Sequence, residues 1–177
     1  TTALVENKYN FNSADVTFLR NISEISSPKK SYIKDDDDNI YQLDNFIYLI
    51  EKRILKGKNA NILAKVNKDK TDKYFFSEGF FNLEDKSFVS KTTKIKIHKS
   101  IFGNDENDPR LYGSSSEGDY KKTIINNGIF TSCKINDNCP PWSIKSEQII
   151  HDKVKKNLIY KNAILKIYDV PVLYFPK

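Results

Sequence analysis

The side chains best suited to chemistry gather in one short stretch, CKINDNCPPWSIKSEQIIH, residues 133–151. This stretch holds both cysteines of the chain, Cys133 and Cys139, its only tryptophan, and His151, one of two histidines. Thiols and imidazoles together can bind zinc, and two thiols can form a redox pair or a disulfide. An imidazole beside a carboxylate can serve as a general base. The spacing of these residues distinguishes between a metal site, a redox site and a structural disulfide.

The spacing favours a disulfide. Structural zinc sites usually take cysteines two to four residues apart, whereas five residues separate Cys133 from Cys139. A thioredoxin-type pair needs two intervening residues at the start of a helix, and Pro140-Pro141 holds Cys139 extended instead. The two cysteines can pair with each other, which stabilises by about 2 kcal/mol, or with cysteines outside this sequence. Either pairing requires an oxidising compartment.

No motif for catalysis accompanies the stretch. The sequence contains no G-x-x-x-x-G-K, no G-x-S-x-G and no H-E-x-x-H. Asp152 could orient His151 as a base, but no nucleophile lies near it in the sequence. His98 shares the Lys-bearing side of its segment and is expected to be solvated. We therefore expect no enzyme, no metal site and no cofactor.

The net charge of +6 is compatible with a polyanionic partner such as nucleic acid, anionic lipid or a phosphorylated glycolipid. Lysine is used almost to the exclusion of arginine, which indicates an AT-rich genome and makes part of this charge compositional. Aromatic residues make up 12% of the chain. They occupy repeated apolar positions, which suits a protein core better than the exposed stacking platform of a nucleic-acid binder. No apolar run is long enough to cross a bilayer as a helix, and no signal peptide is evident, so the chain reads as a processed fragment.

An internal repeat indicates which elements carry these residues. Three stretches of thirteen residues align without gaps, each opening with charge and closing apolar-x-apolar. They are EKRILKGKNANIL (51–63), DKSFVSKTTKIKI (85–97) and KKNLIYKNAILKI (155–167). An aromatic-x-apolar opening precedes each one: YQL at 41–43, YFF at 74–76 and WSI at 142–144, with a fourth opening, YNF, at 9–11.

The repeat predicts strands rather than helices. Ile150, Val154 and Leu158 have helical spacing, but the repeated positions are mostly Ile, Val, Phe, Tyr and Thr, which favour strands. Ile95 and Ile97 alternate with charged neighbours, as in a half-buried strand. The charged pieces fall where hairpin turns belong. The sequence therefore predicts an all-β protein in which stacked antiparallel hairpins share one apolar face.

Two polar stretches interrupt the pattern. Residues 26–39 include four consecutive aspartates, Asp35 to Asp38, which lack the alternating ligand spacing of a calcium loop and predict a solvated turn. Residues 102–119 combine Asn, Asp, Pro, Gly and Ser and predict a long surface loop.

The C-terminal third resembles a known family. The F-T-S-C approach, the W-S-I strand, I-x-H-D-x-x-x-K, N-A-x-L-K and the closing V-P-V-L-Y-F-P are similar to the periplasmic part of the LptD family, the lipopolysaccharide-assembly or organic solvent tolerance proteins. The C-x(5)-C-P-P-W spelling and HKSIFGNDENDPRLYG resemble the alphaproteobacterial branch. The resemblance covers about residues 92–177 closely; over residues 1–91 it rests on the hairpin repeat shared with OstA-like domains.

The resemblance implies a single periplasmic OstA-like β-jellyroll ("β-taco") over residues 1–177, without the family's C-terminal membrane barrel. It implies an apolar groove that takes the acyl chains of lipopolysaccharide from a periplasmic LptA-like bridge protein, joined by edge-strand pairing, and passes them to the outer-membrane barrel. LptE would be a partner only through that missing barrel, and nucleic acid is not expected. The location implied is the periplasmic face of the outer membrane of a Gram-negative cell. In this family, cysteines near the end of the domain can link it to the barrel, a position that Cys133 matches; a local Cys133–Cys139 bond stays open.

The alternating apolar set supplies the candidate groove. The residues expected to line it are Phe11, Phe18, Leu43, Phe76, Phe81, Ile95, Ile97, Ile144, Ile149, Leu165 and Ile167. For each of them an ordinary place in the core between two sheets is an equal alternative. A structural or interaction module with a filled core and a basic nucleic-acid binder are the competing functions.

Overall fold

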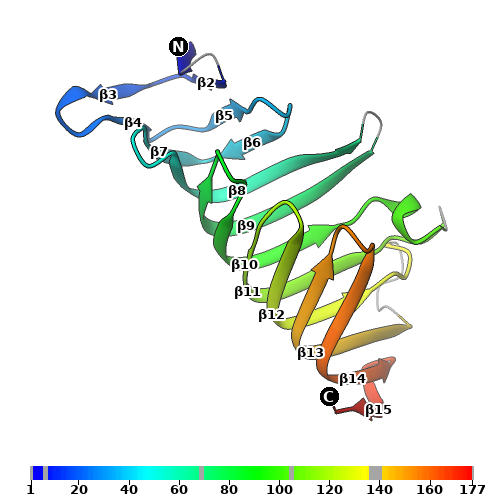
Figure 1. The fold of residues 1–177 in the computed structure, drawn as a ribbon. Helices are drawn as coiled ribbons and strands as arrows, with labels where there is room; N and C mark the ends of the chain where they lie inside the picture. The colour runs from blue at the N-terminus through cyan, green and yellow to red at the C-terminus, as the bar shows by residue number, and fades with distance from the viewer. Residues whose placement is uncertain (1, 6–7, 68–69, 104–105, 136–140, 177) are drawn as a thin grey trace.

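The chain folds into one large antiparallel sheet that is bent over on itself (Figure 1). The computed structural model describes residues 2–5, 8–67, 70–103, 106–135 and 141–176. They form 15 strands and two short 3-10 helices, η1 (Arg20–Ile22) and η2 (Lys99–Phe102). Neither helix has the length or the apolar content needed to cross a membrane. The prediction of an all-β jellyroll built from stacked hairpins is confirmed, and Ile150 and Leu158, whose spacing also fits a helix, lie in two strands with Val154 in the turn between them.

From β8 onward each strand pairs with the next strand in the sequence. The strands of this part are β8 (Ile54–Asn67), β9 (Lys70–Asn82), β10 (Phe88–Lys96), β11 (Arg110–Gly118), β12 (Lys122–Thr131), β13 (Trp142–Asp152), β14 (Asn157–Ile167) and β15 (Val170–Phe175). Because neighbours are antiparallel, β9, β11 and β13 run in one direction and β8, β10, β12 and β14 in the other.

The N-terminal part of the sheet splits into two branches, both joined to β8. One branch is β1 (Thr2–Val5), β2 (Tyr9–Ser13), β5 (Ser31–Lys34) and β6 (Ile40–Leu43), and the other is β3 (Thr17–Leu19), β4 (Glu24–Ser27) and β7 (Asn45–Leu49). Ile40 pairs with Leu63 late in β8, whereas Leu49 pairs with Ile54 at its start. The branches therefore face each other as two layers.

Aromatic rings fill the space between the two branches. The Phe11 ring of β2 lies 5.5 Å from that of Phe46 and 5.0 Å from that of Tyr48, both in β7. Tyr9 makes an edge contact with Tyr48 at 6.1 Å. These residues are almost entirely buried. Large aromatic rings in offset or edge contact stabilise such a core beyond the area they bury.

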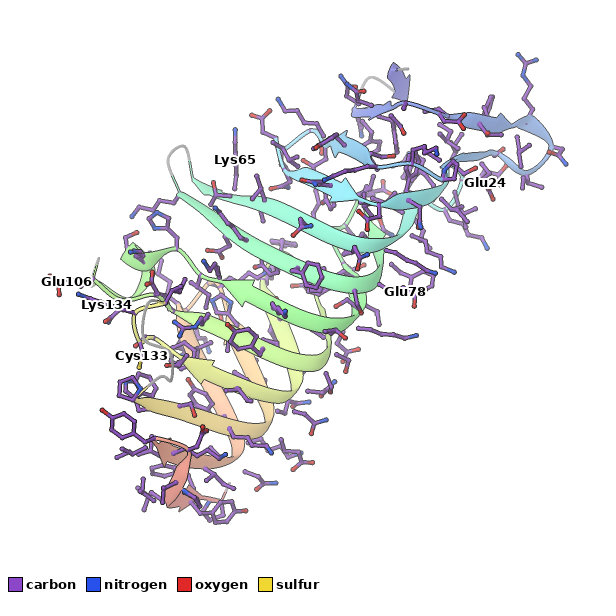
Figure 2. All side chains as sticks on the ribbon, turned by 180° about the vertical axis from the view of Figure 1, so that it is seen from behind. Glu24, Lys65, Glu78, Glu106, Cys133 and Lys134 are labelled. Carbon is purple, nitrogen blue, oxygen red and sulfur yellow. The ribbon has the colours of Figure 1, made fainter. Side chains whose placement is uncertain are left out.

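The bend of the sheet follows a line of residues with left-handed backbone. Asn59, Thr92, Asn127 and Asn162, in the middle of β8, β10, β12 and β14, have φ between 45° and 51°. Asparagine tolerates this region better than most residues. In Figure 2 the strands curve round at the side where Glu78 of β9 lies, and Lys65 lies toward the opposite side. We call this line the crease, and the two halves of the bent sheet its walls.

At the crease each of these strands changes which alternate residues face inward. In β8, Leu55 and Gly57 are buried before the crease, and Ala60 and Ile62 are buried after it. At the crease one residue of each strand, such as Asn59 of β8, drops out of the pairing opposite one residue of its neighbour, so the inward side changes while the register between the strands is kept. A glycine near the crease leaves room for a side chain of the neighbouring strand. A Cβ atom on Gly57 would lie 2.1 Å from Cδ2 of Leu43, so a larger residue would clash there.

The predicted loop over 102–119 is wrong from Arg110 onward. Residues 110–118 form β11 and pair with both β10 and β12. The stretch looks like a loop because polar side chains satisfy one another inside the sheet. Ser116 is buried and its hydroxyl bonds to those of Ser90 and Thr93, at 2.8 and 2.7 Å.

Candidate functional site

A cavity of about 590 Å³ lies between the two walls. Apolar lining comes from both walls, with Tyr41, Ile62 and Tyr74 on one and Phe81 and Phe88 on the other. Since strands β9 and β13 run in the same direction, the start of β9 and the end of β13 lie on opposite walls. Lysines from several turns border the same space. Its size is within the range typical of pockets for small molecules.

One contact between the walls is an ion-pair cluster. Lys86, in the turn after β9, places its Nζ 3.0 Å from Asp35 Oδ2, 3.0 Å from Asp36 Oδ1 and 3.4 Å from Asp37 Oδ2, all in the turn after β5. Burial acts to lower the pKa of Lys86, but the hydrogen bonds and charges of Asp35 and Asp36 raise it above its usual value. The hydrogen bond from Lys86 lowers the pKa of Asp36. We call this cluster the aspartate clasp.

The prediction of a solvated turn at Asp35–Asp38 is wrong for its first residue, because Asp35 is only 4% exposed. Its Oδ1 accepts hydrogen bonds from the backbone of Asp37 and Asn39, and its Oδ2 accepts from the Asn39 amide, the Tyr41 hydroxyl and Lys86. A buried carboxylate needs such compensation. A run of aspartates in the sequence does not reveal that a lysine 51 positions away meets it.

A second contact between the walls is made by Lys153, in the turn after β13. Its Nζ lies 5.5 Å from the ring centroid of Tyr74, at the start of β9, and donates a hydrogen bond of 2.9 Å to the Asp119 carbonyl. Burial lowers the pKa of Lys153 by more than the charges of Asp72 and Asp119 raise it. We call this contact the lysine clasp. Unlike Lys86, Lys153 is incompletely compensated.

Buried polar groups surround the lysine clasp. His151 is 1% exposed, and burial, together with the charge of Lys153, lowers its pKa to about 4, so that the ring is neutral at pH 7. Among the residues that the structure describes, neither its Nδ1 nor the hydroxyl of Thr123, its cross-strand neighbour, has a hydrogen-bond partner. Burial also raises the pKa of Asp72, whose Oδ1 accepts a hydrogen bond from the His98 backbone.

These positions do not form a catalytic dyad. Asp152, proposed to orient His151, instead accepts a hydrogen bond from the Lys155 backbone, while His151 faces the interior. The ring of His98 is half-buried rather than solvated and bonds to Ser100 through Nδ1. In the described part of the chain, no three His, Cys, Asp or Glu side chains are placed to hold a metal ion.

Most of the predicted groove residues face the interior. Seven of them are at most 4% exposed: Phe11, Leu43, Phe76, Phe81, Ile95, Ile97 and Ile149. Only Phe76 and Phe81 of the whole predicted set border the cavity. The other five buried residues are packed in the core on either side of the cavity. The sequence therefore predicted which residues face the interior better than it predicted which of them border the cavity.

Three further members of the set lie near the C-terminal end. Ile144 pairs directly with Phe130 and with Leu165, which places all three on the interior side. Ile144 and Leu165 are partly buried, and Ile167 is 45% exposed. The interior becomes more accessible toward β15, all of whose residues are exposed.

Phe18 is the exception in the predicted set. It pairs with the buried Ile25 but is itself 53% exposed, as are all three residues of β3 by similar amounts. Its strand pairs only with β4, and the described chain leaves half of the ring uncovered. The prediction that Phe18 lines the groove is wrong, because alternation gives the side of a strand and not what covers it.

Cys133 is buried just beyond β12, with its Sγ 3.6 Å from the Trp142 carbonyl (Figure 2). The Arg110 guanidinium donates a hydrogen bond to the Cys133 carbonyl, which fixes this segment against β11. Cys139 lies outside the described residues. The predicted disulfide, local or to another segment, therefore stays a prediction.

Comparison with known proteins identifies the relatives of this chain. No protein-family model matches it. The LPS-assembly protein LptD of Pectobacterium atrosepticum is 32% identical over 123 residues, which is 70% of this chain and 12% of that protein. LptD of Yersinia enterocolitica is 42% identical over 59 residues, 33% of this chain and 7% of its own length, and LptD of Hahella chejuensis is 32% identical over 96 residues, 54% of this chain and 11% of its own length.

The chain is a relative of LptD. The resemblance stated from the sequence motifs is thereby confirmed, whereas its assignment to the alphaproteobacterial branch stays a prediction. The matched segments span only 7% to 12% of the LptD proteins' own length, so the chain corresponds to a small part of them. Relationship to LptD does not by itself assign a role to the cavity or to the two clasps.

Proposed function

We propose that this chain is the N-terminal periplasmic domain of an LptD-type protein and that it takes part, without catalysis, in lipopolysaccharide transport at the outer membrane of a Gram-negative cell. In this proposal the cavity between the walls receives acyl chains of lipopolysaccharide. The observation that supports it is a space of about 590 Å³ inside a bent sheet, bordered by the rings of Phe76, Phe81 and Phe88 as well as by charged side chains, in a chain related to LPS-assembly proteins.

The physical basis is burial of methylene groups. Each methylene moved from water into the cavity contributes about 0.8 kcal/mol, so a segment of about ten gives a gross gain of roughly 8 kcal/mol before the cost of ordering it. This gain is spread over many equal contacts. Such binding can be transferred stepwise to another apolar surface, which suits a carrier that has to release its ligand.

We propose that lipopolysaccharide enters at one end of the sheet and leaves at the other. β1 stands at one end of the strand order and β15 at the other. A strand at a sheet edge can pair with an added strand, and we propose that the β1 end pairs with an LptA-like bridge protein. The β15 end would lead toward the outer-membrane barrel, through which LptE would be engaged.

The competing function is a structural module whose interior is merely a filled core. The N-terminal part favours it, because the rings of Phe11, Phe46 and Tyr48 are buried and packed against one another there. The two functions differ in what Phe88 contacts, since this ring borders the cavity and is half-buried.

Photocrosslinking separates the two. Purified chain carrying p-benzoylphenylalanine in place of Phe88 is irradiated with lipopolysaccharide micelles, and adducts are read on gels by an antibody to the lipid. The matched control places the same group at Lys94, which is exposed on the outer face. A lipid carrier gives adducts from position 88 and few from position 94. Equal yields from both positions would count against lipid entering the cavity.

A further inference from the structure

The lysines around the cavity differ in how well they are compensated. Lys86 belongs to the aspartate clasp, and Lys65 lies 2.8 Å from Asp38. By contrast, Lys153 and Lys156 have no carboxylate within ion-pair distance in the described ranges of the chain. The rim therefore has one side of ion-paired lysines, near β5–β6, and one side, at the β13–β14 turn, where the lysines form no ion pair with any described residue and the nearby carboxylates of Asp72 and Asp119 act on Lys153 only from a distance.

The ammonium group of Lys153 contacts a carbonyl oxygen and an aromatic ring, but no carboxylate within ion-pair distance in the described residues. Its ammonium group has three N–H donors, of which one is used by the Asp119 carbonyl, and it lies over the face of Tyr74. Neither partner carries a full negative charge. The lowered pKa of Lys153 agrees, because a cation with a matched anion would not lose affinity for its proton on burial.

An unsatisfied hydrogen-bonding side chain lies two residues away. His151 borders the cavity and is only 1% exposed, and no group in the described part of the chain forms a hydrogen bond with its Nδ1. An unsatisfied buried group of this kind is costly and is rare in folded proteins. Rotation of the neutral ring would present an N–H or a lone pair to a group seated in the cavity beside Lys153.

We infer that Lys153, with His151 beside it and Lys156 at the rim, forms a subsite for a phosphate monoester at the polar end of an amphipathic ligand. The ligand's apolar part extends from this point along Phe76, Phe81 and Phe88. The inference rests on the proposed function for the apolar part and adds to it the group that fixes the ligand's orientation. The aspartate clasp repels phosphate from the opposite side, so the head group is directed to the lysine clasp.

Binding of two lipids that share acyl chains but differ in phosphate tests the subsite. Affinity of the whole chain is measured by microscale thermophoresis for diphosphoryl lipid A and for the same lipid after enzymatic dephosphorylation. Inorganic phosphate alone is the third probe. Each is measured for the unmodified chain, for Lys153→Gln, and for the control Lys94→Gln, whose ammonium lies over Phe75 on the outer face. Circular dichroism confirms that each variant is folded.

We expect Lys153→Gln to weaken binding of the phosphorylated lipid about tenfold or more, to leave the dephosphorylated lipid unchanged, and to abolish any binding of inorganic phosphate; Lys94→Gln should change none of these. Equal affinity of the unmodified chain for both lipids, or equal loss for both in Lys153→Gln, overturns the subsite and leaves the lipid carrier intact. Phosphate binding that depends on Lys153, without binding of either lipid, supports the subsite for free phosphate and overturns the proposed function instead.

A second readout is independent of the variant. Carbon NMR of the Lys153 side chain reports its pKa directly, and bound phosphate should raise it toward the usual lysine range. An unchanged Lys153 pKa at saturating phosphorylated lipid contradicts contact between the two groups.

Discussion

Lys153 and Tyr74 lie on opposite walls of the bent sheet, and the ammonium of the first is 5.5 Å from the ring centroid of the second. Together with the pair of Lys86 and Asp35, this contact joins the walls on both sides of the cavity. The walls are thus held together by polar contacts at turns, while the crease joins them covalently through the long strands from β8 to β14. This arrangement leaves a space between the walls that is bordered by both rings and charged side chains.

The aspartate clasp is expected to be a major source of stability. Asp35→Ala removes the acceptor of five hydrogen bonds and leaves Lys86 and the Tyr41 hydroxyl partly unsatisfied. Breaking a buried pair from one side costs about 3 to 5 kcal/mol, which urea denaturation will measure. The matched control, Asp37→Ala, concerns an exposed carboxylate and should cost less than about 1 kcal/mol. Similar losses in both variants would contradict the distinct role of Asp35.

His151 predicts a specific sensitivity to acid. Its pKa is about 4 in the folded chain and about 6.5 when unfolded, so the unfolded state binds more protons between these values. Stability should therefore be fully present above pH 6.5 and fall as the pH drops to 4, by about 3 kcal/mol from this residue. Asp72, whose pKa burial raises, acts in the opposite direction, and Lys153 and Asp152 contribute the nearby charges.

Comparison with His151→Gln isolates this contribution, because the other groups remain. Urea denaturation between pH 4 and pH 7 should give a smaller slope of stability against pH for the variant. His98→Gln, which keeps His151, should retain the slope of the unmodified chain. Identical slopes for the unmodified chain and His151→Gln would show that another group is responsible.

At Asn127 the crease should accept glycine more readily than valine, although the equivalent position of β10 is the β-branched Thr92. Asn127 has a φ of 49° and is exposed, and its amide donates a hydrogen bond to the Ser114 hydroxyl that glycine and valine both remove, so the two variants differ mainly in the backbone. Asn127→Gly should change stability by only a few tenths of a kcal/mol, whereas Asn127→Val should cost about 1 to 3 kcal/mol of backbone strain. Thermal unfolding of the pair tests this. Equal melting temperatures would mean that the left-handed backbone is not required at this point of β12.

The cost in stability of removing a phenylalanine ring should depend on how deeply that ring is buried. Phe11→Ala removes a fully buried ring and should cost about 3 to 5 kcal/mol. Phe18→Ala removes a half-exposed ring and should cost less than about 1.5 kcal/mol. The midpoints of urea denaturation of the two variants will measure these costs. A comparable loss of stability in both variants would indicate that the Phe18 ring is covered in solution.

The cysteines can be tested by mass. The intact, non-reduced chain should weigh two hydrogens less than the reduced chain if Cys133 and Cys139 are joined, and peptide mapping should recover the linked pair. The buried Cys133 should resist alkylation in the folded protein either way. A non-reduced chain with the full mass and two thiols that react after unfolding would rule out the local bond and favour a partner elsewhere.

Much of the fold is contained in local patterns. Ile95 and Ile97 alternate with lysines, and the charged pieces near Glu51 and Glu84 fall in turns, so strand and turn positions follow from the sequence. The crease does not, because it needs a left-handed residue in every second strand; in β8 this residue is Asn59, and the buried positions change from Leu55 and Gly57 before it to Ala60 and Ile62 after it. The feature of the sequence that could have indicated the crease is an asparagine in the middle of a strand pattern, because asparagine adopts the left-handed backbone more readily than most residues.

The candidate site was harder to predict for the same reason. Lys86 and Asp35, and Lys153 and Tyr74, meet only because the sheet bends, and nothing local in either member of a pair points to the other. Phe76 and Phe81 were found because a hydrophobic ring has to be buried somewhere. Which buried rings border empty space depends on the separation of the walls, a property of the whole sheet.

The strictly sequential pairing from β8 to β15 has a consequence for how the molecule assembles. Each hairpin finds its partner in the segment just before it, so contacts close over short stretches of chain and folding should be fast for a β protein. Such a chain can grow strand by strand, using the last finished strand as the template for the next.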